Sequence, residues 1–135
     1  MSDKIDLSSN DFNYIGGELK VKIRLEPHPL LTSEGVIVDM SGDLNLYSTP
    51  HVKNILNRLV ETAGKSKIYL DLDELKYIDS SGLGAFLSVQ SKLMKTGGFI
   101  RICSPSRQVT AVLELTKLKS MLKVSHSIDD ALNGR

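Results

Sequence analysis

Runs of β-type residues alternate with amphipathic helical segments along most of this sequence, and this alternation is its strongest constraint on the fold. The β-type runs occupy residues 19–26, 35–42, 67–72, 99–104 and 121–126. Helical segments follow Ser48-Thr49-Pro50, run from Ser80 to Lys95, follow Ser104-Pro105, and occupy residues 127–133. Strands joined by helices form parallel crossovers, whereas the turn-rich stretch PHPLLTSEG predicts that the first two strands are antiparallel. We expect an α/β fold, with a mixed, mostly parallel sheet of four to five strands and helices packed against it.

The chain has the length of one domain. It contains 135 residues, and domains typically contain about 100–150. Residues 1–17 are rich in Ser, Asp and Asn and end in Gly16-Gly17. We therefore expect a flexible N-terminal tail at residues 1–17 and a single domain at residues 18–135. Hydrophobic residues make up 41% of the sequence, which is enough for a core without disulfides or metal.

Charge, cysteine content and hydropathy restrict the classes of partner. The net charge of +1 provides no strong field to attract nucleic acid or an anionic membrane. The single cysteine, Cys103, excludes an internal disulfide and fits a reducing compartment. No apolar run approaches the ~20 residues that span a bilayer, and the polar start MSDKIDLSSNDF differs from a signal peptide. We expect a cytoplasmic protein without a nucleic-acid or membrane partner.

The sequence does not indicate metal or cofactor chemistry. His28, His51 and His126 lie far apart, and none stands beside a second ligand at a spacing typical of metal sites. A glycine-rich loop with Lys, which would hold the phosphates of ATP, does not occur. We therefore predict no metal, no cofactor and no catalytic residue, so the chain is not expected to be an enzyme.

The stretch KYIDSSGLGAFLSVQSKLM, residues 76–94, opens a helix with a weak first turn. Gly82 and Gly84 each cost a helix roughly 1 kcal/mol relative to Ala, while Asp79 or Ser80 is placed to cap it. Such a loss of helix stability without a visible structural return indicates function. Small residues let another molecule approach the backbone, and a helix N-terminus tolerates a phosphate. We interpret Ser80 as a phosphorylation site, where a phosphate adds a charge of about −1.5 to −2 beside Asp79. The alternative is that these residues serve turn formation and packing alone.

This motif and its surroundings resemble the STAS domain of bacterial anti-sigma factor antagonists. The central match is YLDLDELKYIDSSGLGAFLSVQSKLMKTGGFIRICSPS, and SGDLNLYSTPHVKN at residues 41–54 resembles the loop before the family's first helix. The resemblance covers about residues 18–133 and implies a single STAS-like domain. It also implies a partner-binding surface formed by a turn, Asp79, Ser81, Gly82 and Leu83, and a neighbouring loop, Gly42, Asp43, Asn45 and Ser48.

The resemblance implies a phosphorylation-controlled binding module. In this family, an anti-sigma factor that is also a serine kinase phosphorylates the first serine of the motif, here Ser80, and a serine phosphatase removes the phosphate. The unphosphorylated antagonist sequesters the anti-sigma factor and so releases a sigma factor. We expect a monomer or a weak dimer. Asn45 stands where the family often has Asp, which removes a carboxylate from the loop that faces the kinase.

Two alternative functions remain open at the level of the sequence. The same fold would serve as a STAS scaffold that is never phosphorylated, or as a transporter-associated subunit. Asp71 and Asp73 also resemble the motif of haloacid-dehalogenase-type phosphatases, in which one carboxylate attacks phosphorus and the other transfers protons. That family places the motif on its first strand, whereas 70 residues precede Asp71 and 64 follow it here. Solvated acids at a strand end are therefore the favoured interpretation.

Overall fold

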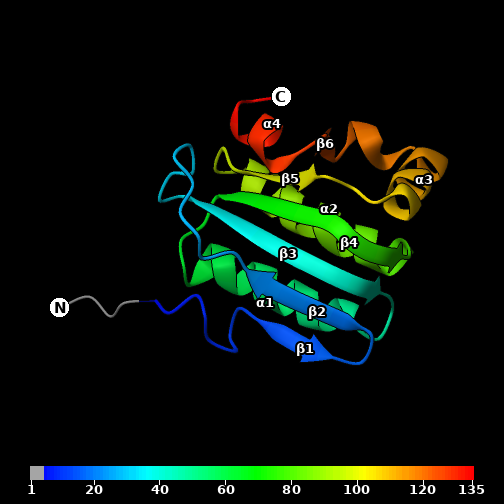
Figure 1. The fold of residues 1–135 in the computed structure, drawn as a ribbon, viewed down its shortest axis with the longest axis horizontal. Helices are drawn as coiled ribbons and strands as arrows, with labels where there is room; N and C mark the ends of the chain where they lie inside the picture. Colours follow the sequence, from blue (N-terminus) through cyan, green and yellow to red (C-terminus); the bar gives the residue numbers. More distant parts are fainter. Residues whose placement is uncertain (1–4) are drawn as a thin grey trace.

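A six-stranded sheet runs through the protein and carries helices on both faces (Figure 1). The computed structural model describes residues 5–135, apart from the side chain of Lys119. In sheet order the strands are β1 (Tyr14–Gly16), β2 (Leu19–Ile23), β3 (Gly35–Leu44), β4 (Lys67–Ile78), β5 (Phe99–Cys103) and β6 (Lys123–Ser125). The helices are α1 (Thr49–Glu61), α2 (Ser80–Met94), α3 (Arg107–Thr116), the 3₁₀ turn η1 (Leu118–Ser120) and α4 (Ile128–Leu132).

The pairing of the strands confirms the predicted mixed, mostly parallel sheet. Strand β2 is antiparallel to both β1 and β3, and β3 to β6 are parallel to one another. The sheet has six strands rather than four to five, because β1 forms a hairpin with β2. Gly17 takes φ +56 in the turn between them, a conformation that glycine adopts without strain.

Residues 5–17 of the segment assigned to a flexible tail contain turns and β1. Phe12 is buried in the main core, and Tyr14 of β1 stacks on His51 of α1 with ring centroids 4.3 Å apart. Residues 1–4 lie outside the described part of the chain.

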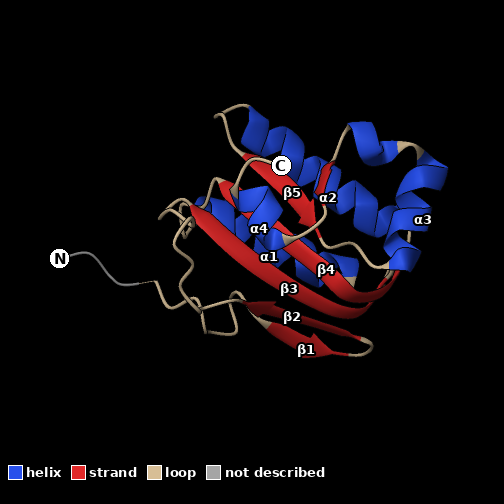
Figure 2. Cartoon of the chain, turned by 45° about the horizontal axis from the view of Figure 1, so that its top comes forward, coloured by secondary structure: helices blue, strands red, loops and turns tan. Residues whose placement is uncertain are grey.

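The two faces of the sheet bury different amounts of apolar surface. One face packs against α1, α2 and α3 and forms the main core, to which β4 contributes Ile68, Leu70 and Leu72. The opposite face has a small cluster in which Tyr69 and Cys103 lie with Ile128 of α4. Figure 2 shows α4 on the side of the sheet away from α1. Much of this second face therefore remains open to solvent.

Strand β4 is longer than the predicted run at residues 67–72 and positions the next helix. It pairs with β5 only as far as Asp71, but it follows β3 as far as Ile78. Register shifts accompany this extension, because β4 has one extra residue opposite the step from Asp39 to Ser41 and another opposite the step from Gly42 to Asp43. Bulges of this kind bend and twist a strand. The end of β4 thus projects past the neighbouring strand, and α2 begins there.

Helix α3 begins later than the Ser104-Pro105 pair predicts. Its N-cap is Ser106, whose hydroxyl accepts a hydrogen bond from the N–H of Val109 at 3.2 Å and donates one to the carbonyl of Leu75 at 2.5 Å. Ser104 instead has φ 49, outside the helical region. The bond to Leu75 ties the start of α3 to β4, a long-range contact that local sequence cannot indicate.

Replacing Gly42 with alanine is expected to destabilise the fold strongly. Gly42 has φ +95, and a Cβ there would lie 1.8 Å from the carbonyl oxygen of Glu18. We expect Gly42→Ala to lower the free energy of unfolding by about 2–4 kcal/mol in urea denaturation. Gly17→Ala is the matched control, because Gly17 has φ +56 but nothing within 4 Å of its would-be Cβ; it should lose about 1 kcal/mol. Equal losses in the two variants would contradict a role for close packing at Gly42.

Candidate functional site

Helix α2 begins where β4 leaves the sheet, and Asp79 forms the junction. The N–H of Asp79 donates to the carbonyl of Leu44 at 3.2 Å, next to the last β3–β4 pair. The Asp79 carboxylate then accepts hydrogen bonds from the N–H groups of Ser81, at 3.0 Å, and Gly82, at 3.2 Å, and from the Ser81 hydroxyl. It therefore satisfies two of the backbone donors that a helix N-terminus leaves free. Of the two capping residues considered from the sequence, the structure selects Asp79.

The Asp79 carboxylate also connects the start of α2 to the loop before α1. Its burial alone would raise the pKa of Asp79, but hydrogen bonds from Ser81, Gly82 and the backbone of Leu46 outweigh burial and hold this pKa below its ordinary value. The group is thus a carboxylate at neutral pH. Because Leu46 belongs to the loop between β3 and α1, one negative charge fixes the relative position of both segments.

Asn45 and Ser48 give that loop its shape. The side-chain oxygen of Asn45 accepts hydrogen bonds from the N–H of Tyr47, at 2.9 Å, and of Ser48, at 3.1 Å. The hydroxyl of Ser48 accepts from the N–H of Asn45 at 2.9 Å and donates to the carbonyl of Asp43 at 3.1 Å. Such local side-chain bonds are typical of turns. Both residues therefore hold the backbone in place, and Ser48 is itself buried.

A second contact between the two segments joins Thr49 and Ser81. Their hydroxyl oxygens lie 3.2 Å apart, and the Thr49 hydroxyl also donates to the carbonyl of Asn45 at 2.7 Å. The sequence analysis treated Thr49 as part of a helix start and did not connect it with this site. The pairing depends on residues 32 positions apart, so no local pattern indicates it.

Ser80 is exposed at the first position of α2. Within residues 5–135 its hydroxyl makes no hydrogen bond. Three large apolar residues on the adjoining segments are exposed to solvent: Leu46 at 66% and Tyr47 at 85%, in the loop whose backbone bonds to Asp79, and Tyr77 at 48%, near the end of β4. Exposed apolar groups that gather in one place commonly mark a surface for protein binding. Sequence reasoning missed Leu46 and Tyr47, although two large apolar residues inside a polar loop were a detectable signal.

The structure separates the two glycines of the weak first turn. A Cβ on Gly82 would lie 2.9 Å from the side chain of Leu44 and 3.0 Å from that of Ile78, so Gly82 is required for close packing of α2 on the sheet. A Cβ on Gly84 would meet nothing within 4 Å. Packing therefore explains Gly82, whereas Gly84 leaves bare backbone on the exposed side of the helix.

The remaining residues predicted for the partner-binding surface divide into two groups. Asp43 lies at the end of β3, opposite Tyr77 in the register of β4, and belongs to the same edge as Ser80. Leu83 is buried in the main core, and Gly42 packs against the backbone of Glu18. Leu83 and Gly42 can therefore influence the surface only by positioning its backbone.

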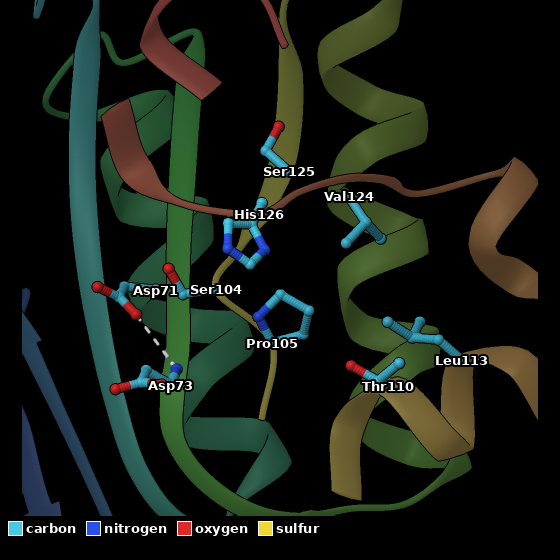
Figure 3. Close-up of a pocket in the computed structure, with 9 residues that line it drawn as sticks. All are labelled: Asp71, Asp73, Ser104, Pro105, Thr110, Leu113, Val124, Ser125 and His126. Atoms are coloured by element: carbon cyan, nitrogen blue, oxygen red, sulfur yellow. Dashed lines mark hydrogen bonds between the residues drawn. The ribbon is translucent and has the colours of Figure 1, made fainter. Parts of the chain in front are cut away.

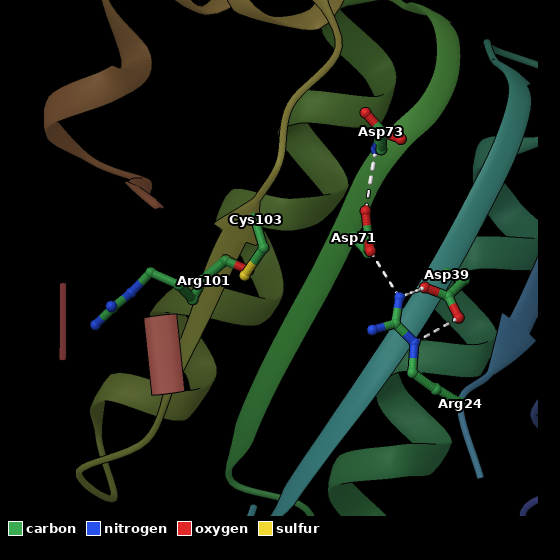
Figure 4. A network of polar contacts seen from close by, with 6 residues as sticks. All are labelled: Arg24, Asp39, Asp71, Asp73, Arg101 and Cys103. Carbon is green, nitrogen blue, oxygen red and sulfur yellow. Dashed lines mark hydrogen bonds and ion pairs between the residues drawn. The ribbon is translucent and has the colours of Figure 1, made fainter. Parts of the chain in front are cut away.

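Asp71 and Asp73 form a separate polar region on the open face of the sheet. Arg24 forms ion pairs with Asp39 and, at 2.6 Å, with one carboxylate oxygen of Asp71 (Figure 4). The other Asp71 oxygen accepts a hydrogen bond from the N–H of Asp73 at 3.2 Å. A carboxylate engaged at both oxygens is poorly suited to attack phosphorus. Burial raises the pKa of Cys103 to about 12, so this thiol is protonated at neutral pH.

A hollow of about 500 Å³ adjoins this region, beside the middle of β4 and the carboxyl end of β5 (Figure 3). Its polar lining includes Asp73, Ser104 and His126. Among the described residues, no three His, Cys, Asp or Glu side chains are grouped so as to hold a metal ion. None of the helices described is long and apolar enough to cross a membrane.

Comparison with known proteins relates the sequence and the fold to one family. The sequence profile of the STAS domain matches residues 27–131. A candidate anti-sigma factor antagonist of Thermotoga maritima is 28% identical over 102 residues, which cover 76% of this chain and 90% of that protein. The anti-sigma-B factor antagonist of Staphylococcus aureus is 27% identical over 92 residues, which cover 68% of this chain and 84% of that protein.

Two solved structures of the Bacillus anti-sigma factor antagonist SpoIIAA share the fold. The unphosphorylated form has a TM-score of 0.66 and 20% identity, and the alignment covers 85% of this chain and 97% of that one. The phosphorylated form has a TM-score of 0.63 and 17% identity, with coverage of 85% and 99%. At this identity the comparison establishes the fold.

Removing the Asp79 carboxylate is expected to destabilise the protein in a pH-dependent way. We expect Asp79→Ala to lower the free energy of unfolding at pH 7 by about 1–2 kcal/mol, the usual effect of losing an N-cap. The pKa of Asp79 is lowered in the folded state, so its stabilisation is complete above the unfolded pKa, near 4, and is lost as the pH falls through the folded value. Urea unfolding of both proteins from pH 7 to about pH 2.5 measures this difference.

Asp73→Ala is the control, because Asp73 is an exposed carboxylate in the middle of β4, away from the cap of α2. It should change stability by less than about 0.5 kcal/mol. A difference between wild type and Asp79→Ala that stays constant down to the lowest pH would rule out the charged cap.

Proposed function

This chain belongs to the STAS domain family, and from that premise we propose that it is an anti-sigma factor antagonist controlled by phosphorylation of Ser80. The unphosphorylated protein binds and sequesters an anti-sigma factor that is also a serine kinase, which releases a sigma factor. Phosphorylation of Ser80 ends this binding, and a serine phosphatase restores it. The chain acts as a binding module and not as an enzyme.

The observation that carries this proposal is the exposure of Ser80 on α2 beside exposed apolar side chains. A kinase needs access to the hydroxyl, and Ser80 is exposed at the first helical position. A partner needs apolar surface that it can bury, which Leu46 and Tyr47 supply. The same surface thus serves as docking site and as kinase substrate.

The position of Asp79 explains how phosphorylation would weaken the complex. A phosphoserine carries about −1.5 to −2 charges at neutral pH, and the two N–H groups of Ser81 and Gly82 already bind the Asp79 carboxylate. The new charge would therefore lie beside an existing negative charge, and two N–H donors of the first turn are already engaged by that charge. A partner that docks on this surface would have to bury both charges, which is unfavourable.

The names of the relatives agree with this function. The matched proteins of T. maritima and S. aureus are described as a candidate anti-sigma factor antagonist and an anti-sigma-B factor antagonist. SpoIIAA has been solved both with and without its phosphate. The competing interpretation of Asp71 as a phosphatase nucleophile has less support, since Asp71 pairs with Arg24 at 2.6 Å.

Substitution of Ser80 tests the switch directly. We expect Ser80→Ala to bind the partner kinase as wild type does but to resist phosphorylation, and Ser80→Asp to weaken binding at least about tenfold, or 1.4 kcal/mol. Pull-down from the organism's lysate identifies the partner, and titration calorimetry with the purified pair measures the affinity. After incubation with the kinase and ATP, intact-mass analysis detects the phosphate and peptide mapping locates it.

Ser88→Asp is the matched control, since Ser88 is exposed on the same helix two turns from the cap. It should bind as wild type does. Equal affinities of wild type, Ser80→Ala and Ser80→Asp would reject the switch and leave the unphosphorylated STAS scaffold.

Substitution of the exposed apolar side chains tests the docking surface. We expect the double variant Leu46→Ser/Tyr47→Ser to bind the partner at least about tenfold more weakly, because truncation of buried interface side chains typically costs more than 1 kcal/mol. Its thermal stability should stay within about 0.5 kcal/mol of wild type. Leu115→Ser, at an exposed leucine of α3, controls for loss of surface apolarity. Undiminished binding of the double variant would place the interface elsewhere.

A further inference from the structure

We propose that the free edge of β5, between α2 and β6, binds a small amphiphilic anion with an alkyl chain and a carboxylate or phosphate head. This site is distinct from Ser80 and its neighbouring loop. The inference depends on two adjacent hollows, one mostly apolar and one cationic, that share Arg101 and Lys123 in their linings.

Arg101 and Lys123 are like charges that the sheet holds side by side. They are register partners on the parallel strands β5 and β6, so their Cα atoms lie about 5 Å apart. Like charges placed opposite each other in a sheet are destabilising. Neither residue forms an ion pair with a carboxylate in the described part of the chain.

The geometry of Arg101 fits the binding of an anion. Its guanidinium lies over the ring of Phe99, 5.1 Å from the centroid, and its one hydrogen bond to protein is a long one of 3.4 Å from Nη1 to the Ser125 hydroxyl. The buried Nε atom has no partner. In Figure 4 the side chain extends from β5 away from Asp71, whereas Arg24 is neutralised by two carboxylates. A fixed, unpaired guanidinium is the usual anchor for carboxylate and phosphate groups.

The larger hollow provides room for an apolar chain. It measures about 560 Å³, within the range of about 300–1,000 Å³ that small-molecule sites occupy. Its apolar lining consists of Leu87 and Met94 of α2, Phe99 and Ile100 of β5, and Met121. Met94 and Met121 are 64% and 57% exposed, and methionine adapts its shape readily to bound apolar groups.

The backbone along this edge is satisfied by a side chain. Strand β6 pairs with β5 only from Arg101 onward, so the edge at Ile100 is not covered by a strand. The side-chain oxygen of Gln90 accepts a hydrogen bond from the N–H of Ile100 at 2.6 Å, and its amide group donates to the carbonyl of Met121 at 3.5 Å. With this donor engaged, an added peptide strand is disfavoured and an alkyl chain is favoured.

The second hollow places further positive charge beside the two shared cations. It measures about 330 Å³ and is lined by Arg101, Lys123, Val124, Gly134 and Arg135. Asp130 lies 3.9 Å from Arg135 and neutralises part of its charge. The head group is therefore assigned to the unpaired Arg101 and Lys123, and the alkyl chain to the groove beside Met94 and Met121.

Titration of the full chain with decanoate, below its micelle concentration, tests this site. We expect decanoate to cause saturable changes of the amide NMR shifts at residues 98–101 and 123. Two control ligands should bind at least about fivefold more weakly than decanoate: decyl maltoside, which has an uncharged head, and inorganic phosphate, which has no chain. Decyl phosphate should bind as decanoate does, because the two share the proposed chemistry. Equal binding of decyl maltoside, or of inorganic phosphate, would overturn the amphiphilic ligand.

Substitutions separate the two halves of the site. Arg101→Gln and Lys123→Gln should each weaken decanoate binding about fivefold. Met94→Gln should weaken the binding of decanoate but not the binding of phosphate. The control is Lys53→Gln on α1, which is exposed and outside both hollows and should change the binding of neither ligand. Lys123 is exposed, so its variant remains informative if Arg101→Gln fails to fold. The proposal would be rejected by any of three results: unchanged decanoate affinity in Lys123→Gln, NMR shift changes confined to other residues, or binding of an acidic helical peptide in preference to decanoate.

Discussion

The hydrogen bonds of Asp79 hold together the edge of the domain at which α2 begins. Strand β4 delivers Asp79 to the end of the sheet, where its N–H bonds to Leu44 of β3. The carboxylate then binds the first turn of α2 and the backbone of Leu46 in the preceding loop. The N–H and the carboxylate of this one residue thus connect the end of β3, the loop before α1 and the first turn of α2. Because the Asp79 carboxylate binds the N–H groups of Ser81 and Gly82, the first turn of α2 is held in place and Ser80 lies exposed at its start.

The two faces of the sheet show how the rest of the chain supports that edge. One face buries the main aliphatic core under three helices, which fixes the strands and, through them, the junction at Asp79. The other face has a small apolar cluster under α4 and otherwise carries charge. There Arg24 is matched by Asp39 and Asp71, whereas Arg101 lies next to Lys123 and pairs with no carboxylate of the described residues. The charges are therefore balanced at one side of the open face and left unbalanced at the other.

Sequence reasoning succeeded where a local pattern determines the structure. The alternation of strands and helices, the antiparallel start of the sheet and a helix cap at Asp79 or Ser80, which the structure places at Asp79, are each encoded within a few residues. It did not find β1, whose pairing depends on a hairpin at Gly17, or the start of α3 at Ser106, which depends on a bond to Leu75. The contact of Thr49 with Ser81 and the pairing of Arg101 with Lys123 likewise arise from register between distant segments.

The two glycines in the first turns of α2 have different explanations. Gly82 has a sufficient structural cause, because any side chain there would press against Leu44 and Ile78. No such cause exists at Gly84, where a Cβ would meet open space, although alanine would stabilise a helix there by about 1 kcal/mol. Stability alone therefore does not account for Gly84. The docking surface proposed above accounts for it, because bare backbone lets another protein approach closely, and the exposed Ser80 lies one helical turn away on the same segment.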